Sequence, residues 1–299
     1  NLSFTASQEG FRVVGQGEVH DVAIELQATK NGTGDPEILV GTTVSVADAQ
    51  KFGIDLSEFI TGQVRLVGQP LDDGAFKVSA DLVDAALTIS DIGVSKARGV
   101  AGGLNAVIRA RENEIEVTDV ELGFGSVRLE GGLTLASGGA LTAANFSTFQ
   151  ISPGDSARVS MTPTDSGFSL AVRGEQLDIK PMLKRFFNLE GDQSAGASED
   201  LGNQTFNVSV QLERALGYFG TAAYNVDLDL AVRGEELRRV NLSAQLGGDR
   251  TISATTNPMP SGRVISYASN DIGGVLRFVG IYPRLVGGEG TMVMRYDAE

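Results

Sequence analysis

Residues 206–212 read Phe-Asn-Val-Ser-Val-Gln-Leu, with an apolar side chain at every second position. Residues 226–232 (Val-Asp-Leu-Asp-Leu-Ala-Val) and 76–82 (Phe-Lys-Val-Ser-Ala-Asp-Leu) show the same alternation. Successive side chains of a β-strand point to opposite faces, so these stretches form a sheet with one apolar and one polar face. Because the pattern recurs from end to end between Gly, Asn and Asp turns, it predicts an all-β protein.

The apolar face of such a sheet must be covered by a second sheet, by helices, or by a ligand or lipid. Few helices are expected here, and all of them are short. Two arrangements are therefore open: closure of the sheet on itself as a sandwich, or curling of the sheet into a gutter.

Composition supports an ordered chain and excludes several functions. The 299 residues include 38 glycines, 8 prolines and 41% hydrophobic residues, which suits a turn-rich β protein. A net charge of −14 opposes nonspecific binding to nucleic acid or to an anionic membrane surface. The absence of cysteine excludes disulfides and thiolate chemistry, and no run approaches the ~20 apolar residues that cross a bilayer.

The alternation predicts many strands and three short helices. The helices are expected at 46–52, 177–187 and 270–279, and hairpin turns at 111–114 and 137–139. Residues 180–187 carry three cations among apolar side chains, which fits a helix capping one end of the sheet or a helix touching a membrane. The strands are expected at 2–6, 11–29, 37–46, 62–69, 74–89, 103–111, 114–122, 126–136, 141–151, 156–162, 167–173, 204–213, 223–233, 236–247, 249–256, 262–268 and 289–296.

One segment stands out as a module boundary. Residues 190–203 are small, acidic and rich in Gly and Ser, which is typical of a flexible linker. We therefore predict one β-rich module over 1–189 with short connector helices, and a second β-rich module over 204–299.

Four segments resemble the bacterial AsmA-like proteins of the YhdP and TamB type, and in particular their C-terminal part. The segments are 92–99 (Ile-Gly-Val-Ser-Lys-Ala-Arg-Gly), the stretch 172–183, the stretch 271–282, and 287–291 (Gly-Gly-Glu-Gly-Thr); between the first two lies the run 104–135, which we expect to form a meander. The resemblance spans about residues 40–299, and its motifs are structural. It favours the elongated, curved, mostly antiparallel sheet that forms a gutter with an apolar inner face.

The resemblance also implies a function and a location. AsmA-like proteins are envelope proteins anchored in the inner membrane by an N-terminal helix, with a β-rich periplasmic body related to bridge-type lipid transfer proteins. This chain lacks the anchor and much of the expected length, and it begins at Asn1 within strand-like sequence, so we expect one section of a longer protein. The implied partners are phospholipid and, through parts missing here, the inner and outer membranes; no nucleic acid and no cofactor is expected.

In this interpretation, the apolar face binds acyl chains. The alternative is that the same residues fill the closed core of a non-catalytic structural or interaction module, a β-sandwich of a cell-envelope protein. The residues expected on this face are Phe76, Val78, Ala80, Leu82, Leu104, Ala106, Ile108, Phe206, Val208, Val210, Leu212, Val226, Leu228, Leu230 and Val232.

Residue types that carry catalysis are scarce. His20 is the only histidine, so a His-rich metal site is excluded, and we expect it on the surface. Asp227 and Asp229 share a strand face, where they are paired acids, calcium ligands or charges of a solvated surface; we favour the last of these. No phosphate-binding glycine motif stands between a strand and a helix, so we predict that the protein is not an enzyme.

Overall fold

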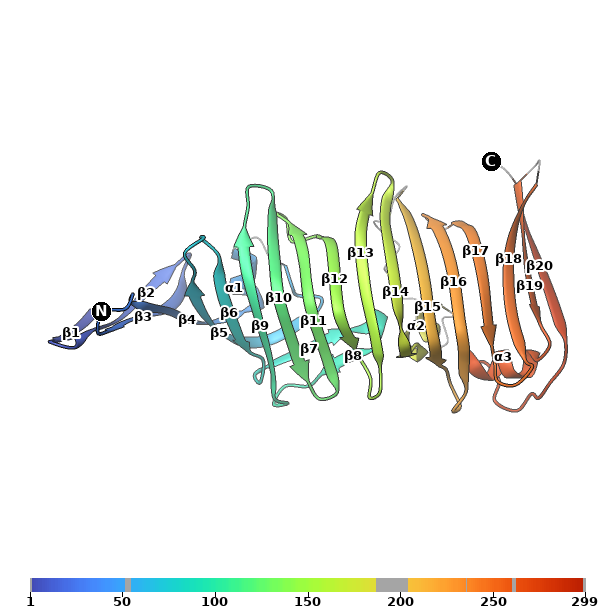
Figure 1. Cartoon of the computed structure of the whole chain (residues 1–299), viewed down its shortest axis with the longest axis horizontal. Helices are drawn as coiled ribbons and strands as arrows, with labels where there is room; N and C mark the ends of the chain where they lie inside the picture. Colours follow the sequence, from blue (N-terminus) through green and yellow to red (C-terminus); the bar gives the residue numbers. More distant parts are fainter. Residues whose placement is uncertain (1, 52–54, 187–203, 235, 260–261, 298–299) are drawn as a thin grey trace. The chain divides into compact units, whose positions relative to one another are not determined.

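The computed structural model describes all residues except 1, 52–54, 187–203, 235, 260–261 and 298–299 (Figure 1). The described residues form twenty strands and three short α-helices, and all strand pairs but one are antiparallel in the described ladders. The prediction of an all-β, mostly antiparallel fold is therefore confirmed. The chain divides into two compact units: unit 1 comprises residues 1–90 and 94–144, and unit 2 comprises 91–93 and 145–299.

Unit 1 is a meander with one side branch. Strands β1 to β6 pair in chain order, after which β6 pairs with β9, β9 with β10, and β10 with β11. The start of β5 pairs with β7, and β7 pairs with β8 in a separate small ribbon. The elements are β1 (Leu2–Ser7), β2 (Gly10–Val19), β3 (Val22–Asn31), β4 (Glu37–Ser45), α1 (Val46–Lys51), β5 (Ile60–Pro70), β6 (Phe76–Asp81), β7 (Ala85–Ile89), β8 (Val94–Lys96), β9 (Gly102–Ala110), β10 (Glu114–Phe124) and β11 (Val127–Ala136).

Unit 2 is also a row of neighbouring strands, seen from β13 to β20 in Figure 1. Strand β14 pairs antiparallel with β13 and parallel with β15, and from β15 to β20 each strand pairs antiparallel with the next. The elements are β13 (Ser156–Thr164), β14 (Gly167–Asp178), α2 (Lys180–Phe186), β15 (Thr205–Leu216), β16 (Ala222–Arg233), β17 (Glu236–Gln245), β18 (Thr251–Met259), β19 (Gly262–Ser269), α3 (Ile272–Phe278) and β20 (Gly290–Asp297). Strand β12 (Leu141–Gln150) contains the point at which the units divide.

The sheets are open. Among the described ladders, β1 has β2 as its one neighbour and β20 has β19. An open sheet matches the gutter expectation, whereas a sandwich would close the sheet on itself. The predicted linker 190–203 lies outside the described residues, so the division into modules 1–189 and 204–299 stays a prediction.

Two of the predicted strands each contain a turn and are two strands in the structure. The run 11–29 is two strands, because His20 and Asp21 adopt φ values of 50° and 60° and form a two-residue hairpin turn. The run 74–89 breaks after β6, since the chain turns at residues 82–84 and enters β7 instead of continuing. In both runs the apolar positions change parity at the turn, from odd to even numbers across residues 20–21 and from even to odd numbers across 82–84, so a single strand over either run does not fit the pattern.

The predicted helices and hairpin turns are confirmed with small shifts at their ends. The helix expected from residue 177 begins at Lys180, because β14 extends to Asp178. The Asp178 carboxylate accepts the backbone N–H of Lys180 at 3.1 Å and Pro181 follows, as is usual at a helix start. The Lys180 ammonium lies 2.9 Å from the Asp178 carboxylate, and the Lys180 carbonyl accepts the Tyr218 hydroxyl at the end of β15. Helix α2 thus caps the end of the unit 2 sheet, the first of the two interpretations.

Candidate functional site

The eight residues predicted for the second half of the chain are direct cross-strand partners. They belong to β15 and β16, which pair antiparallel without a shift over this stretch. Directly opposite side chains of an antiparallel pair lie on the same face about 5 Å apart. The pairs are Phe206 with Val232, Val208 with Leu230, Val210 with Leu228, and Leu212 with Val226.

This apolar face continues on both sides of the two strands. On β14, Phe168, Leu170 and Val172 are the partners of Phe206, Val208 and Val210, and the Phe168 and Phe206 ring centroids lie 5.8 Å apart. We call the whole face the unit 2 strip. It consists of Phe168, Leu170, Val172, Phe206, Val208, Val210, Leu212, Val226, Leu228, Leu230, Val232, Leu237, Val240, Leu242, Ala254, Ile265, Tyr267, Met292 and Met294.

The part of the strip on β17 to β19 is the most tightly packed. Val240, Ala254 and Ile265 form a buried cluster, against which Leu228 and Leu230 of β16 pack. Tyr267 also packs on this cluster, and burial, with a smaller contribution from Tyr296, raises the pKa of the Tyr267 hydroxyl. Most of the remaining strip is half-buried, so its side chains contact each other and still reach solvent.

The opposite face of the same strands is polar. Gln211, Asp227 and Asp229 are exposed, and the Arg173 guanidinium donates to the Ser209 carbonyl at 3.1 Å. Asp227 and Asp229 do share this face, as the alternation predicts. No group of three or more His, Cys, Asp or Glu residues is placed to hold a metal within the described part of the chain.

The predicted residues of the first half are brought together in the same way. Phe76, Val78 and Ala80 on β6 are the partners of Ile108, Ala106 and Leu104 on β9. Leu82 directly follows β6 at the next even-numbered position after Ala80, and it is buried. The face extends to Leu66 on β5 and through β10 to β11. We call it the unit 1 strip: Leu66, Phe76, Val78, Ala80, Leu82, Leu104, Ala106, Ile108, Val117, Val120, Leu122, Leu129 and Leu133.

A β-bulge keeps β10 in this strip. Val117 and Val120 are three residues apart, so regular alternation would place them on opposite faces. The register shifts between them, with Thr118 and Asp119 facing the single residue Gly132 and Asp119 at φ 50°. Because the extra residue reverses the alternation, Val120 and Leu122 return to the face of Val117.

The unit 1 strip is open at one end and closed at the other. Phe76 is 46% exposed, whereas Leu82 at the far end of the same run is 5% exposed. The closing element is the β7–β8 ribbon, and the side chain of its last residue, Lys96, is buried. The Lys96 ammonium donates to the carbonyl oxygens of Leu82, of Ala85 at 2.7 Å and of Ala97 at 3.4 Å.

The unit 2 strip is closed at the end where β15 meets the helices. Leu212 and Ala215 are buried there. The Tyr218 amide donates to the Phe278 carbonyl of α3 at 3.0 Å, and its hydroxyl donates to the Lys180 carbonyl of α2. Both helices are thus tied to the turn between β15 and β16. At the other end of β15, Phe206 is half-buried.

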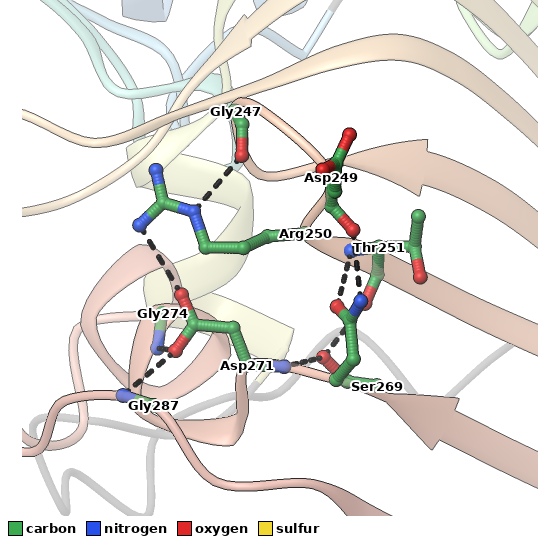
Figure 2. Close-up of polar contacts among 9 residues, drawn as sticks. Gly247, Asp249, Arg250, Thr251, Ser269, Asp271, Gly274 and Gly287 are labelled. Atoms are coloured by element: carbon green, nitrogen blue, oxygen red, sulfur yellow. Dashed lines mark hydrogen bonds and ion pairs between the residues drawn. The ribbon is translucent and has the colours of Figure 1, made fainter.

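A buried carboxylate fixes α3 in this closure (Figure 2). Asp271 Oδ1 accepts the backbone N–H groups of Gly274 at 2.8 Å and Gly287 at 3.0 Å, and Oδ2 lies 3.3 Å from the Arg250 guanidinium. The Asp271 amide donates to Ser269 Oγ at 3.1 Å. One side chain therefore joins the start of α3, the segment after it, and the β17–β18 turn that carries Arg250.

Ionisable groups with shifted pKa values lie mainly outside the strips. Hydrogen bonds from Arg109 and from Arg263 lower the pKa of Asp73 and of Glu236, and Arg111 lowers that of Glu116. His20 is exposed in its hairpin turn, as expected. What the strips offer is apolar contact along a row of strands; the prediction that the protein is not an enzyme stays a prediction.

Sequence reasoning predicted the helix that caps the unit 2 sheet, but it missed the strip residues on neighbouring strands, the β7–β8 ribbon as a closing element, and the roles of Lys96 and Asp271. Phe168, Leu170 and Val172 alternate as clearly as residues 206–212, so the pattern alone allows their assignment. Lys96 and Asp271 carry no comparable pattern, because their roles depend on which backbone groups the fold brings around them.

Comparisons with known proteins do not assign the chain to a family. No family model matches the chain, and no match was found among curated proteins or among solved structures. The AsmA-like resemblance is therefore still a hypothesis. Within the described part of the chain, no helix has the length and apolar character needed to cross a membrane.

Proposed function

We propose that the two strips bind the acyl chains of glycerophospholipids, and that the chain is a segment of an envelope-spanning AsmA-like protein that supports lipid transport between inner and outer membranes. One observation carries the proposal. In each unit, the apolar residues predicted from alternation lie on one face of paired strands, and away from the closed end most of them keep part of their surface exposed. A face of this kind has apolar contact area left for a ligand.

The energetics favour acyl chains over more polar ligands. Each methylene group moved from water to apolar surroundings contributes about 0.8 kcal/mol, so a long chain gains from a row of Val, Leu, Ile and Phe side chains without any hydrogen bond. The polar side chains lie on the opposite face, so the strips offer the charged headgroup no specific partner. We therefore expect low headgroup specificity. The proposal places this segment in the periplasm, with the membrane anchor in another part of the full-length protein.

A second candidate is a non-catalytic structural or interaction module. The open edges of β1 and β20 favour it, since an unpaired edge strand can pair with a strand of another protein. In that case the strips are contact surfaces within an assembly, and no lipid is bound to the isolated chain.

Native mass spectrometry combined with lipid extraction tests the proposal. The strand neighbours Val210 and Ser209 are a matched pair, since they lie on opposite faces of β15, and Val78 and Ser79 are the corresponding pair on β6. We expect phospholipid to copurify with the wild-type chain and to be lost in Val210→Asp, Leu228→Asp and Val78→Asp. Ser209→Asp and Ser79→Asp should keep it.

The variants must be compared as folded proteins, which circular dichroism and thermal unfolding establish. A folded wild-type chain that is lipid-free and also fails to take up labelled lipid would refute acyl-chain binding and favour the interaction module. Equal loss of lipid in the Asp variants of both faces would show that binding is not located on the strips.

A further inference from the structure

A second apolar feature lies outside the strips, in the segment that follows α3. Residues 281–286 read Ile-Tyr-Pro-Arg-Leu-Val, and all six are exposed, with Tyr282 at 51% and Val286 at 78%. We call this segment the apolar loop. Soluble proteins expose single apolar side chains routinely, but a short run of them marks a binding surface.

Hydrogen bonds hold the apolar loop at both ends. At its start, the amides of Ile281 and Tyr282 donate to the Leu276 carbonyl at 2.9 and 3.2 Å. At its end, the Gly287 amide donates to Asp271 (Figure 2). The Gly287 carbonyl accepts from the Gly273 amide at 3.0 Å. These hydrogen bonds fix the loop backbone in the conformation that exposes its apolar side chains.

Close packing shows how the loop is kept against α3. A Cβ atom on Gly273 would lie 2.6 Å from the Leu285 carbonyl oxygen, so the helix and the loop backbone meet where only glycine fits. The turn before β16 adjoins the other end of the same helix, since Tyr218 contacts Gly280 and Phe278. Its neighbour Phe219 is also exposed, which adds an aromatic side chain near the loop.

The local charge differs from that of the whole chain. Residues 272–288 contain Arg277 and Arg284 and no Asp or Glu, in a protein of net charge −14. Repulsion from an anionic membrane is thus lower at this segment than the net charge of the whole chain implies. A cation beside a tyrosine and branched aliphatic residues is the combination found where proteins enter the interfacial region of a bilayer.

We propose that the apolar loop docks on a lipid bilayer, with Ile281, Tyr282, Leu285 and Val286 in the interfacial region and Arg284 among the headgroups. A bilayer fits better than a protein partner because a specific protein interface takes roughly 20–30 residues from each side, and the loop is far smaller. A bilayer requires no complementary shape. The inference does not depend on acyl-chain binding by the strips.

The chain contains no tryptophan, so a single introduced tryptophan reports on one position. We would prepare Tyr282→Trp and, as a matched control, Met259→Trp. Met259 is 47% exposed and lies at the opposite end of the β18–β19 hairpin from α3. Emission is recorded with and without vesicles of phosphatidylcholine and phosphatidylglycerol, and quenching by brominated lipids in the same vesicles gives the depth.

We expect the emission of Tyr282→Trp to shift to shorter wavelength and to be quenched, and that of Met259→Trp to stay unchanged. Adding Val286→Asp should weaken vesicle binding about tenfold or more, because one apolar side chain is replaced by a charge. Unchanged emission of Tyr282→Trp would overturn the proposal, as would equal shifts at both positions. A shift that appears without vesicles as protein concentration rises would assign the loop to contact between copies of the chain.

The same probe separates this inference from lipid binding by the strips. Val210→Asp combined with Tyr282→Trp should lose bound phospholipid and keep the vesicle-induced shift. Loss of the shift in this folded double variant would show that the strip, and not the loop, carries membrane contact.

Discussion

The two units close one end of their apolar strips with side chains of opposite charge. In unit 1, the Lys96 ammonium donates to the carbonyl oxygens of Leu82 and Ala85 at the turn between β6 and β7, and of Ala97 directly after β8. In unit 2, the Asp271 carboxylate accepts amides at the start of α3 and after it. An irregular segment that covers the end of a sheet leaves backbone groups without regular partners. A turn leaves carbonyls, which need a donor, and a helix start leaves amides, which need an acceptor.

The largest effect is expected from breaking the unit 2 closure. Asp271→Ala leaves the Gly274 and Gly287 amides without their acceptor in a buried place, and we expect a loss of about 3 kcal/mol in the free energy of unfolding. Asp271→Asn retains one oxygen and should lose less. Urea unfolding measures the difference, and hydrogen exchange should show earlier loss of protection at these two amides.

Asp249 provides the control for this prediction, because it is exposed in the adjacent turn and its backbone carbonyl, not its side chain, accepts from Asn270. Asp249→Ala should change the stability little. If Asp271→Ala unfolds at the same urea concentration as the wild type, the carboxylate is not what fixes α3.

Breaking the unit 1 closure should have the next largest effect. Lys96→Met keeps the aliphatic stem and removes the donors to the Leu82, Ala85 and Ala97 carbonyls, so we expect a loss of about 2 kcal/mol. Lys77→Met, on the exposed face of β6, is the control with the same chemical change. Equal unfolding midpoints for the two variants would mean that the buried ammonium contributes no more than a surface lysine.

The sequence predicted the strips well and the closures poorly, for a physical reason. Strand faces follow from a local period of two, so residues 206–212 and 226–232 could be assigned to one face without knowing the fold. The partner of a strand is not local: β14 pairs parallel with β15, and β6 pairs with β9 although β7 and β8 lie between them in the sequence. The bulge at Asp119 also needs the opposing Gly132 to be explained.

The closing residues illustrate the same limit more strongly. Lys96 and Asp271 both lie in segments that resemble the AsmA-like proteins, and the sequence places Asp271 near a helix start. What makes each of them important is the set of backbone groups around it, contributed by Leu82 and Ala85 in one case and by Gly287 and Arg250 in the other. Such a role follows from packing, and no pattern in a single sequence encodes it.

The smallest effect comes from a carboxylate that makes the same kinds of bond as Asp271 without its burial. At the start of α1, Asp48 accepts the Ser45 amide at 2.9 Å and hydroxyl at 2.7 Å, and lies 3.0 Å from the Lys51 ammonium. These hydrogen bonds, the Ser45 hydroxyl first, lower the pKa of Asp48 from 3.8 to about 2. A carboxyl group with a lowered folded-state pKa stabilises the fold above pH 3.8 and loses this contribution as the pH falls toward 2. Carbon-13 NMR titration of the Asp48 side chain should give a pKa near 2, and Ser45→Ala should move it back toward 3.8.

Because Asp48 is solvated, Asp48→Ala should shift the unfolding midpoint far less than Asp271→Ala does. If the two variants were equally destabilised, burial would not be what distinguishes the closure of unit 2 from a partly exposed carboxylate at a helix start.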